Sequence, residues 1–267
     1  MPFVELDGLR LHFLRAGTGP RLLFISGTGG DLRQRPGVFE SPLAREFDLL
    51  AYDQRGLGQT DKPAGPYSMR DYADDAARLL DALGWDQTHV MGVSFGGMVA
   101  QEFALRHPQR VARLVLACTS AGGAGGASYP LHEIAHLPSD ERFVRQLAIS
   151  DLRQTPQWQR DNPETVQKML AWSTAAAQID SGDPARARGA AMQLDARRGH
   201  DTWDRLATLR MPVLLCAGQY DGIAPLANME SMAGCIPSAQ LRVYQGGHMF
   251  LLQDRAAYAD IIAWLKA

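Results

Sequence analysis

The chain has 267 residues, of which 46% are hydrophobic and 21% are charged, and its formal net charge is −2. A chain of this length and composition can bury a sizeable core as one domain with an insertion. Because positive and negative charges are balanced, we expect neither nucleic acid nor a membrane as a partner.

The N-terminal residues and the cysteines bear on the compartment. Residues 1–5 contain no basic segment followed by an apolar one, so we expect neither a signal peptide nor a membrane span. The three cysteines, Cys118, Cys216 and Cys235, form an odd set without the spacing of a disulfide framework. This pattern favours a reducing compartment, and we expect a cytoplasmic protein.

Apolar runs alternate with helical patterns along most of the chain. Residues 3–6 and 9–14 flank Asp7-Gly8, a typical hairpin turn. Continuous apolar runs predict strands that are covered on both faces, at residues 21–26, 48–53, 88–93, 111–118, 212–218 and 240–244. Helices are predicted between them, at residues 68–83, 98–106 and 254–265. This alternation is typical of a mostly parallel sheet with helices on both sides.

A glycine-rich loop, Ser26-Gly27-Thr28-Gly29-Gly30, follows the first of these apolar runs. Such a loop can bind phosphate, but no Gly-Lys-Ser/Thr is present and the third glycine of G-x-G-x-x-G would fall on Leu32. An oxyanion hole needs two backbone N–H groups, and one of them should come from a loop that follows an earlier strand. We interpret this loop as that side of the hole, to which Thr28 contributes its backbone N–H.

Gly92-Val93-Ser94-Phe95-Gly96 is a G-x-S-x-G pattern between a predicted strand and a predicted helix. The pattern alone is weak in a chain with 26 glycines, but this context is the one that a nucleophile elbow requires. Its glycines let the backbone pass close to the turn and leave the serine hydroxyl exposed at the strand end. Ser94 is therefore the candidate nucleophile, and Phe95 is the candidate for the second N–H of the oxyanion hole.

Residues 122–200 interrupt the alternation and carry no strand pattern. A glycine-rich stretch at 122–126 precedes predicted helix starts at Ser139, Asn162-Pro163 and Asp183-Pro184. We expect a helical cap over the C-terminal edge of the sheet, with the core formed by residues 1–121 and 201–267. Most apolar residues of this segment should pack inside the cap, and the candidates for contact with a substrate are Met169, Trp172 and Met192.

His132-Glu133-Ile134-Ala135-His136 matches H-E-x-x-H, the pattern of zinc metallopeptidases. On a helix the two histidines would share one face and bind zinc. Here Pro130 and Pro138 leave room for about two helical turns, and the nearby candidates for a third ligand are Glu141 and Glu164. We favour a short cap helix whose histidines face solvent or line the pocket, and we expect no metal and no cofactor.

The C-terminal third supplies a base and an acid for Ser94, because a serine hydroxyl needs a base and the base needs an orienting acid. Asp221 follows one predicted strand in an Asp-Gly pair, which is also common in ordinary turns. His248 follows the next strand and is preceded by two glycines. We assign His248 as the base and Asp221 as the acid. The order Ser, Asp, His differs from that of the two familiar serine protease families.

With these residues in place, the chain resembles the α/β-hydrolase superfamily over nearly its whole length. It is most similar to the small bacterial esterase, enol-lactonase and carbon–carbon hydrolase branches. Further matches are the run Tyr52-Asp53-Gln54-Arg55-Gly56-Leu57-Gly58 and the Asp-Gly-Ile-Ala-Pro run at 221–225. The resemblance implies the α/β-hydrolase fold, with a mostly parallel eight-stranded sheet, helices on both faces and a helical cap insertion.

The resemblance also implies that Asp53 and Arg55 brace the loops beneath the site. The family usually has His-Gly where this chain has Ser26-Gly27, so the support of that loop should differ. Dehalogenase and epoxide hydrolase branches carry aspartate at the elbow, and Ser94 argues against both.

These features predict a serine hydrolase that cleaves a small-molecule carboxylic ester or lactone through an acyl-enzyme. The candidate substrate contacts are Gly27, Trp172, Met249 and Phe250. Two alternatives use the same triad, namely hydrolysis of a carbon–carbon bond in a ring-fission diketone and perhydrolysis of short acids. A ligand-binding protein of hydrolase fold and a zinc metallopeptidase are the alternatives without serine catalysis. No pattern indicates the natural substrate or the oligomeric state.

Overall fold

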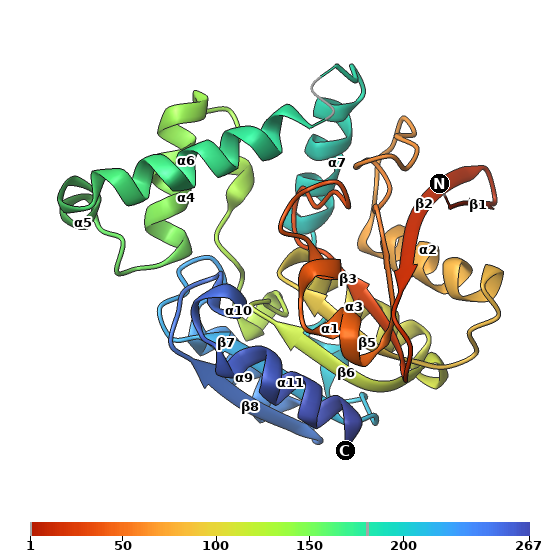
Figure 1. Ribbon diagram of the computed structural model, residues 1–267. Coiled ribbons are helices and arrows are strands. Elements are labelled where there is room, and N and C mark those ends of the chain that lie inside the picture. Colours follow the sequence, from red (N-terminus) through yellow and green to blue (C-terminus); the bar gives the residue numbers. More distant parts are fainter. Residues whose placement is uncertain (1, 180–181) are drawn as a thin grey trace.

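An eight-stranded sheet forms the centre of the computed structural model, which describes residues 2–179 and 182–267 (Figure 1). The strands lie in the order β1-β2-β4-β3-β5-β6-β7-β8. The pairs β1–β2 and β2–β4 are antiparallel, and all pairs from β4 to β8 are parallel. The predicted mostly parallel eight-stranded sheet is confirmed. The strands are β1 (Phe3–Leu6), β2 (Leu9–Ala16), β3 (Arg21–Ile25), β4 (Asp48–Tyr52), β5 (Thr88–Val93), β6 (Val111–Ala117), β7 (Val213–Gly218) and β8 (Ala239–Tyr244).

Helices cover both faces of the sheet, because alternate residues of a strand point to opposite sides. Leu23 and Ile25 of β3 belong to a core cluster with residues of α2 (Met69–Ala82), α3 (Phe95–Arg106), α8 (Trp203–Leu206) and α9 (Leu226–Cys235). Leu22 of the same strand belongs to the cluster on the other face, with residues of α1 (Leu43–Glu46), α10 (Phe250–Gln253) and α11 (Ala256–Lys266). Two short 3₁₀ turns, η1 (Val38–Glu40) and η2 (Pro108–Arg110), lie between these elements.

The predicted helix at 68–83 is present as α2, and its start follows from two side chains. The Ser68 hydroxyl accepts the N–H of Asp71 at 3.2 Å, and the Asp71 carboxylate accepts the N–H of Ser68 at 2.8 Å. This reciprocal capping satisfies two N–H groups that would otherwise lack partners. In the part of the chain that the structure describes, no helix combines the length and the apolar character needed to cross a membrane.

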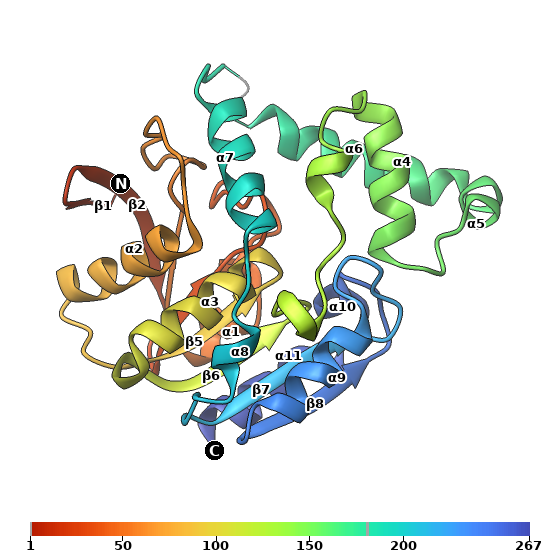
Figure 2. The same ribbon diagram turned by 180° about the vertical axis from the view of Figure 1, so that it is seen from behind.

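The segment 122–200 is helical, and its described residues contain no strand. The turns η3 (Gly123–Gly125) and η4 (Leu131–Glu133) precede four helices, α4 (Ser139–Ser150), α5 (Pro156–Asp161), α6 (Pro163–Gln178) and α7 (Arg186–Arg198). Figures 1 and 2 show α4, α5 and α6 gathered beside one another away from the sheet, whereas α7 runs back toward α8. Helix α5 is not predicted from the sequence, although Thr155 before Pro156 is a typical helix start. The Thr155 hydroxyl accepts the N–H of Trp158.

The H-E-x-x-H pattern does not form the short helix that we expected. Leu131–Glu133 is the 3₁₀ turn η4, and residues 134–136 form a turn. The flanking prolines leave room for about two turns only, and so few residues offset little of the cost of starting an α-helix. His132 and His136 therefore do not share the face of a helix, as a zinc site of this pattern requires.

Helix α7 approaches the core backbone to backbone at Gly189. A Cβ atom at Gly189 would collide with the carbonyl oxygen of Gly56 and would lie 2.9 Å from the Cα atom of Gly56. Close by, Arg188 donates to the carbonyl oxygen of Lys62 at 2.8 Å, and Lys62 pairs with Asp183 at 2.9 Å. These contacts fix α7 to the loop between β4 and α2.

We predict opposite effects of alanine at two helical glycines. Gly189→Ala should lower the free energy of unfolding by roughly 1–3 kcal/mol, because the new methyl group has no space against Gly56. Gly234→Ala is the matched control in α9, where a Cβ atom meets nothing within 4 Å. It should raise the free energy of unfolding by about 1 kcal/mol through helix propensity. Urea unfolding measures both, and a Gly189→Ala protein as stable as the wild type would contradict the packing described here.

Candidate active site

Ser94 occupies a strained turn between β5 and α3. Its φ of 56° lies in the left-handed region, which non-glycine residues rarely adopt. The N–H of Ser94 donates to the carbonyl oxygen of Ala117 at 2.8 Å, and Thr119 donates its hydroxyl to the carbonyl oxygen of Ser94 at 2.8 Å. The turn also needs Gly96, where a Cβ atom would collide with the carbonyl oxygen of Ile25. The elbow therefore lies directly against the end of β3.

The structure brings the side chains of Ser94, His248 and Asp221 together in one line. The Nε2 atom of His248 is 2.9 Å from the Ser94 hydroxyl, and its Nδ1 atom is 2.8 Å from Oδ2 of Asp221. If Nδ1 donates to the carboxylate oxygen, Nε2 is the nitrogen that accepts a hydrogen bond from the Ser94 hydroxyl. The hydroxyl, the imidazole and the carboxylate thus form a continuous chain of two hydrogen bonds.

Asp221 is fixed by its own backbone surroundings. Its Oδ1 atom accepts the N–H groups of Ile223 and Ala224 at 2.8 and 2.9 Å. Its Oδ2 atom is left for His248, and the side chain is inaccessible to solvent. The Asp-Gly turn after β7 thus orients the carboxylate as well as reversing the chain.

The end of α4 holds both the histidine loop and the aspartate loop, which sequence reasoning did not foresee. The carbonyl oxygen of Ser150 accepts the N–H of His248 at 2.6 Å, and that of Ile149 accepts the N–H of Gly222 at 3.0 Å. Gln253 accepts the N–H of Gly247 at 2.8 Å and donates to Asp151 at 3.0 Å. The position of His248 therefore depends on the segment that begins the predicted cap.

Two backbone N–H groups lie free beside Ser94. The backbone N–H groups of Thr28 and Phe95 donate to no backbone carbonyl oxygen within residues 2–179 and 182–267. Gly27, next to Thr28, is so close to the elbow that a Cβ atom there would lie 3.4 Å from Cβ of Ser94. Neither of these N–H groups is therefore used in the backbone hydrogen bonds of the fold.

Glutamines support this loop where the family usually has histidine. Gln54, which is fully buried, donates to the carbonyl oxygen of Ser26 at 2.8 Å and to its hydroxyl at 3.3 Å. Gln193 of α7, also fully buried, accepts the N–H of Gly29 at 2.9 Å. The support therefore comes partly from the core and partly from the segment 122–200.

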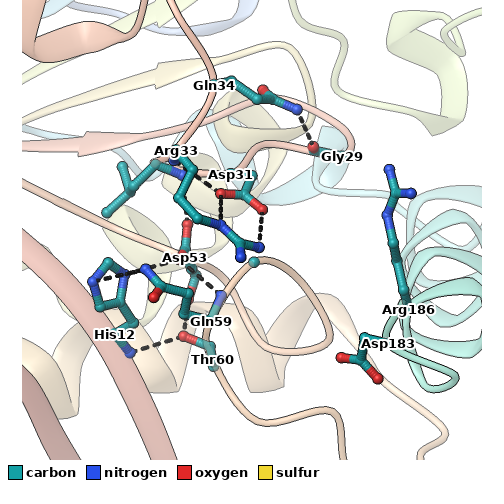
Figure 3. Close-up of polar contacts among 12 residues, drawn as sticks. His12, Gly29, Asp31, Arg33, Gln34, Asp53, Gln59, Thr60, Asp183 and Arg186 are labelled. Atoms are coloured by element: carbon teal, nitrogen blue, oxygen red, sulfur yellow. Dashed lines mark hydrogen bonds and ion pairs between the residues drawn. The ribbon is translucent and has the colours of Figure 1, made fainter. Parts of the chain in front are cut away.

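Asp53 joins three parts of the chain beneath the site (Figure 3). Its carboxylate accepts the N–H of Leu32 at 2.7 Å and that of Gln59 at 3.0 Å, and it contacts Nδ1 of His12 at 2.9 Å. Burial raises the pKa of Asp53, and the donors from Gln59 and Leu32 oppose this rise. Arg55 forms two hydrogen bonds of 2.7 Å with Asp75. Both geometries suit the bracing role that the resemblance implies.

Two adjoining cavities lie beside His248. A cavity of about 300 Å³ is lined by His248 and Met249, and a cavity of about 430 Å³ is lined by Met169, Trp172 and Met249. Both linings are mostly apolar, and Leu252 is shared by the two. The candidate contact Met249 therefore lines both cavities, whereas Trp172 lines only the larger one, which His248 does not line.

Two other candidates pack elsewhere. Phe250 is fully buried in the core, where its ring stacks on Tyr244 with 5.1 Å between centroids. It follows Met249 at the start of α10, and this helix turns its aromatic ring toward β8. Met192 packs against the core and would contact a Cβ atom at Gly65. We do not propose either as a substrate contact.

Cys118 lies beside the imidazole and the carboxylate, and burial raises the pKa of its thiol well above the ordinary value. Among the described residues, Cys118, Asp221 and His248 are the group of metal-ligand types that comes together. The latter two are hydrogen-bonded to each other, and a protonated thiol is a poor ligand. The side chains of this group thus suit proton transfer better than metal binding.

Comparisons with known proteins agree with this geometry. Residues 20–254 match the family model described as alpha/beta hydrolase fold. The chain is 33% identical to the poly(3-hydroxyalkanoate) depolymerase of Ectopseudomonas oleovorans, over 97% of this chain and 89% of that protein. It is 31% identical to a 2-hydroxymuconate semialdehyde hydrolase of Pseudomonas putida, over 96% and 90%. The enol-lactonase from Burkholderia xenovorans LB400 has the same fold, with a TM-score of 0.79, 20% identity and 99% coverage of both chains.

We predict that Cys118 does not react with thiol reagents in the folded protein. Burial holds the pKa of Cys118 well above its usual range and raises that of Cys216 to about 12, so both stay protonated at pH 8. A disulfide reagent such as dithionitrobenzoate should titrate one thiol at most, that of the half-buried Cys235, and all three after unfolding. Rapid titration of two or more thiols in the native protein would contradict this.

Proposed function

Because the chain belongs to the α/β-hydrolase family, we propose that this hydrolase cleaves a carboxylic ester or lactone with Ser94, His248 and Asp221 as its catalytic triad. The observation that carries the proposal is the continuous chain of hydrogen bonds between these side chains, with 2.9 Å between hydroxyl and Nε2 and 2.8 Å between Nδ1 and carboxylate. The named substrate of the depolymerase relative, poly(3-hydroxyalkanoate), is a polyester, which also favours ester chemistry.

In the proposed reaction, His248 takes the proton of Ser94 as the hydroxyl oxygen attacks the carbonyl carbon of the ester. The N–H groups of Thr28 and Phe95 stabilise the tetrahedral oxyanion. Asp221 keeps the imidazole in the required tautomer and stabilises its charged form. His248 then protonates the leaving alcohol, and water releases the acid from the acyl-enzyme in a second addition and elimination.

We also propose that residues 122–200 act as a cap over a core formed by residues 1–121 and 201–267. Support comes from the larger cavity, which is lined by Met169 and Trp172 of α6 and by Met249 of the core. Gly27, Met249 and Trp172 remain the proposed substrate contacts. Their apolar surroundings favour an ester with a hydrophobic part. The three unpaired cysteines support a cytoplasmic location.

A second candidate function is hydrolysis of a carbon–carbon bond in a ring-fission product. The relative from Pseudomonas putida, a 2-hydroxymuconate semialdehyde hydrolase, supports it at 31% identity. Both reactions use a base, a nucleophilic serine or an activated water and two oxyanion donors. Turnover of matched substrates decides between them.

We predict that aryl esters and lactones are hydrolysed faster than ring-fission diketones. Ser94→Ala and Asp221→Asn should each lower kcat/KM on the preferred substrate by roughly 10⁴-fold or more, because triad members act as a unit. The test is a panel of the three substrate classes, run with wild type and both variants. Near wild-type turnover by Ser94→Ala would refute the nucleophile, and exclusive turnover of the diketones would favour the second function.

We predict that Gln253 positions the histidine loop. Gln253→Ala removes the acceptor for the N–H of Gly247 and the link to Asp151, so the imidazole should lose its fixed place. A displacement of about 1 Å can cost roughly 10²-fold, and we expect kcat to fall by about ten- to a hundredfold with little change in KM. The control is Gln157→Ala, an exposed residue of α5 that bonds only within its own helix. An equal loss in both variants, or a change in KM alone, would rule out the positioning role.

A further inference from the structure

Arg197 is a buried guanidinium that has no carboxylate partner among the described residues. It lies near the end of α7 and is 6% exposed. Its Nη1 atom donates to the carbonyl oxygen of Tyr129 at 2.7 Å, whereas Nε and Nη2 are buried and donate to no acceptor within residues 2–179 and 182–267. Burial lowers the pKa of Arg197 to about 10, so the group is still cationic at neutral pH. An uncompensated buried charge is costly unless a bound anion offsets it.

Arg197 lines a cavity of about 120 Å³ whose titratable lining is entirely basic or neutral. No described carboxylate lines it, although the chain holds 29 acidic and 27 basic residues. The electrostatic field inside therefore favours a negative ligand. The polar lining consists of Ser120, Ser128, His132, Arg197, Arg198 and His200.

The hydrogen-bonding groups of this cavity match a carboxylate. Nε and Nη2 form the edge of a guanidinium that can donate two parallel hydrogen bonds to the two oxygens of a carboxylate. Both atoms are inaccessible to solvent here, so the guanidinium has to turn toward the cavity to present this edge to a ligand. The Ser120 hydroxyl accepts a hydrogen bond from Asn228 at 2.9 Å, which leaves its proton available for an acceptor. The volume corresponds to about four water molecules, enough for a carboxylate on a short chain but not for a nucleotide.

We propose that this cavity, the Arg197 pocket, binds a small carboxylate. The pocket lies beside the elbow, since Met98 lines it one helical turn after Ser94 and Ser120 follows Thr119, which donates to Ser94. The carboxylate has two possible sources, the distal acid group of a half-ester substrate or a free short-chain acid. Binding of the free acid does not depend on the proposed hydrolysis.

Thermal unfolding at fixed ionic strength tests binding directly, with butyrate, succinate and inorganic phosphate as separate probes. A carboxylate should raise the Tm of the wild type and of Ser94→Ala alike, which separates this proposal from the proposed catalysis. Arg197→Met should abolish the rise. Without ligand, this variant should unfold at the same temperature as the wild type or higher, because an unpaired buried charge is gone. A purely structural Arg197 would instead give a lower Tm.

Two further variants make the test specific. Arg188→Met removes the same charge from α7 outside the pocket and should respond to carboxylate as the wild type does. Arg197→Lys keeps the charge but loses the two-pronged edge, and its apparent affinity should fall at least tenfold. It also decides the matter if Arg197→Met does not fold. The proposal is overturned if no carboxylate shifts the wild type, if Arg197→Met and Arg197→Lys respond as the wild type does, or if phosphate alone binds.

Kinetics identify the source of the carboxylate. The aryl hemisuccinate and the aryl pentanoate have acyl chains of similar length, but only the former carries a distal carboxylate. If the pocket holds the substrate, Arg197→Met should lower the ratio of kcat/KM for hemisuccinate over pentanoate at least tenfold. If it holds a free acid, the ratio should stay unchanged while the Tm response is lost. Either result supports the pocket. If Arg197→Met changes neither the ratio nor the Tm response, the proposal is overturned.

Discussion

The left-handed backbone at Ser94 is the constraint on which the site depends. A serine keeps this conformation only where the surroundings leave it no alternative. Here the elbow is fixed by Ala117 and Thr119 of the β6 side, and Gly96 lets α3 come into contact with the end of β3. The same close approach places the loop after β3, with Gly27 and Thr28, beside the nucleophile. One tight turn thus brings the proposed nucleophile close to the loop that carries one of the proposed oxyanion donors.

The side chains of Asp221 and His248 belong to loops rather than to helices or strands. Asp221 is oriented by the N–H groups of Ile223 and Ala224, and its loop and that of His248 are both hydrogen-bonded to the end of α4. Buried hydrogen bonds of this kind are costly to break, because each partner would be left without a substitute. The imidazole is therefore held by neighbours on both sides and needs no helix or strand of its own.

Local patterns predicted the sheet, and they singled out the three side chains of the proposed triad, because apolar runs, glycines and capping residues act over a few neighbours. Ser68 with Asp71 marked α2, and G-x-S-x-G marked the elbow. Contacts between distant residues left no such pattern. Nothing near Gln253, Gln193 or Arg197 in the sequence indicates what each one faces across the fold. Phe250 shows the same limit, since an apolar residue near a candidate catalytic histidine suits a pocket and a core equally well, and its helix turns it toward the core.

The segment 122–200 contacts the loops of the candidate site at two places, the end of α4 and the middle of α7. Ser150 and Ile149 hold the loops of His248 and Asp221, and Gln193 holds Gly29 of the oxyanion loop. Exchange of this segment for that of a relative would therefore cut these three connections to the candidate site at once. A functional chimera has to carry over the last turn of α4 and Gln193 of α7 together with their hydrogen-bond partners in the core. A change of this segment therefore alters the lining of the larger cavity and the support of the His248 loop together.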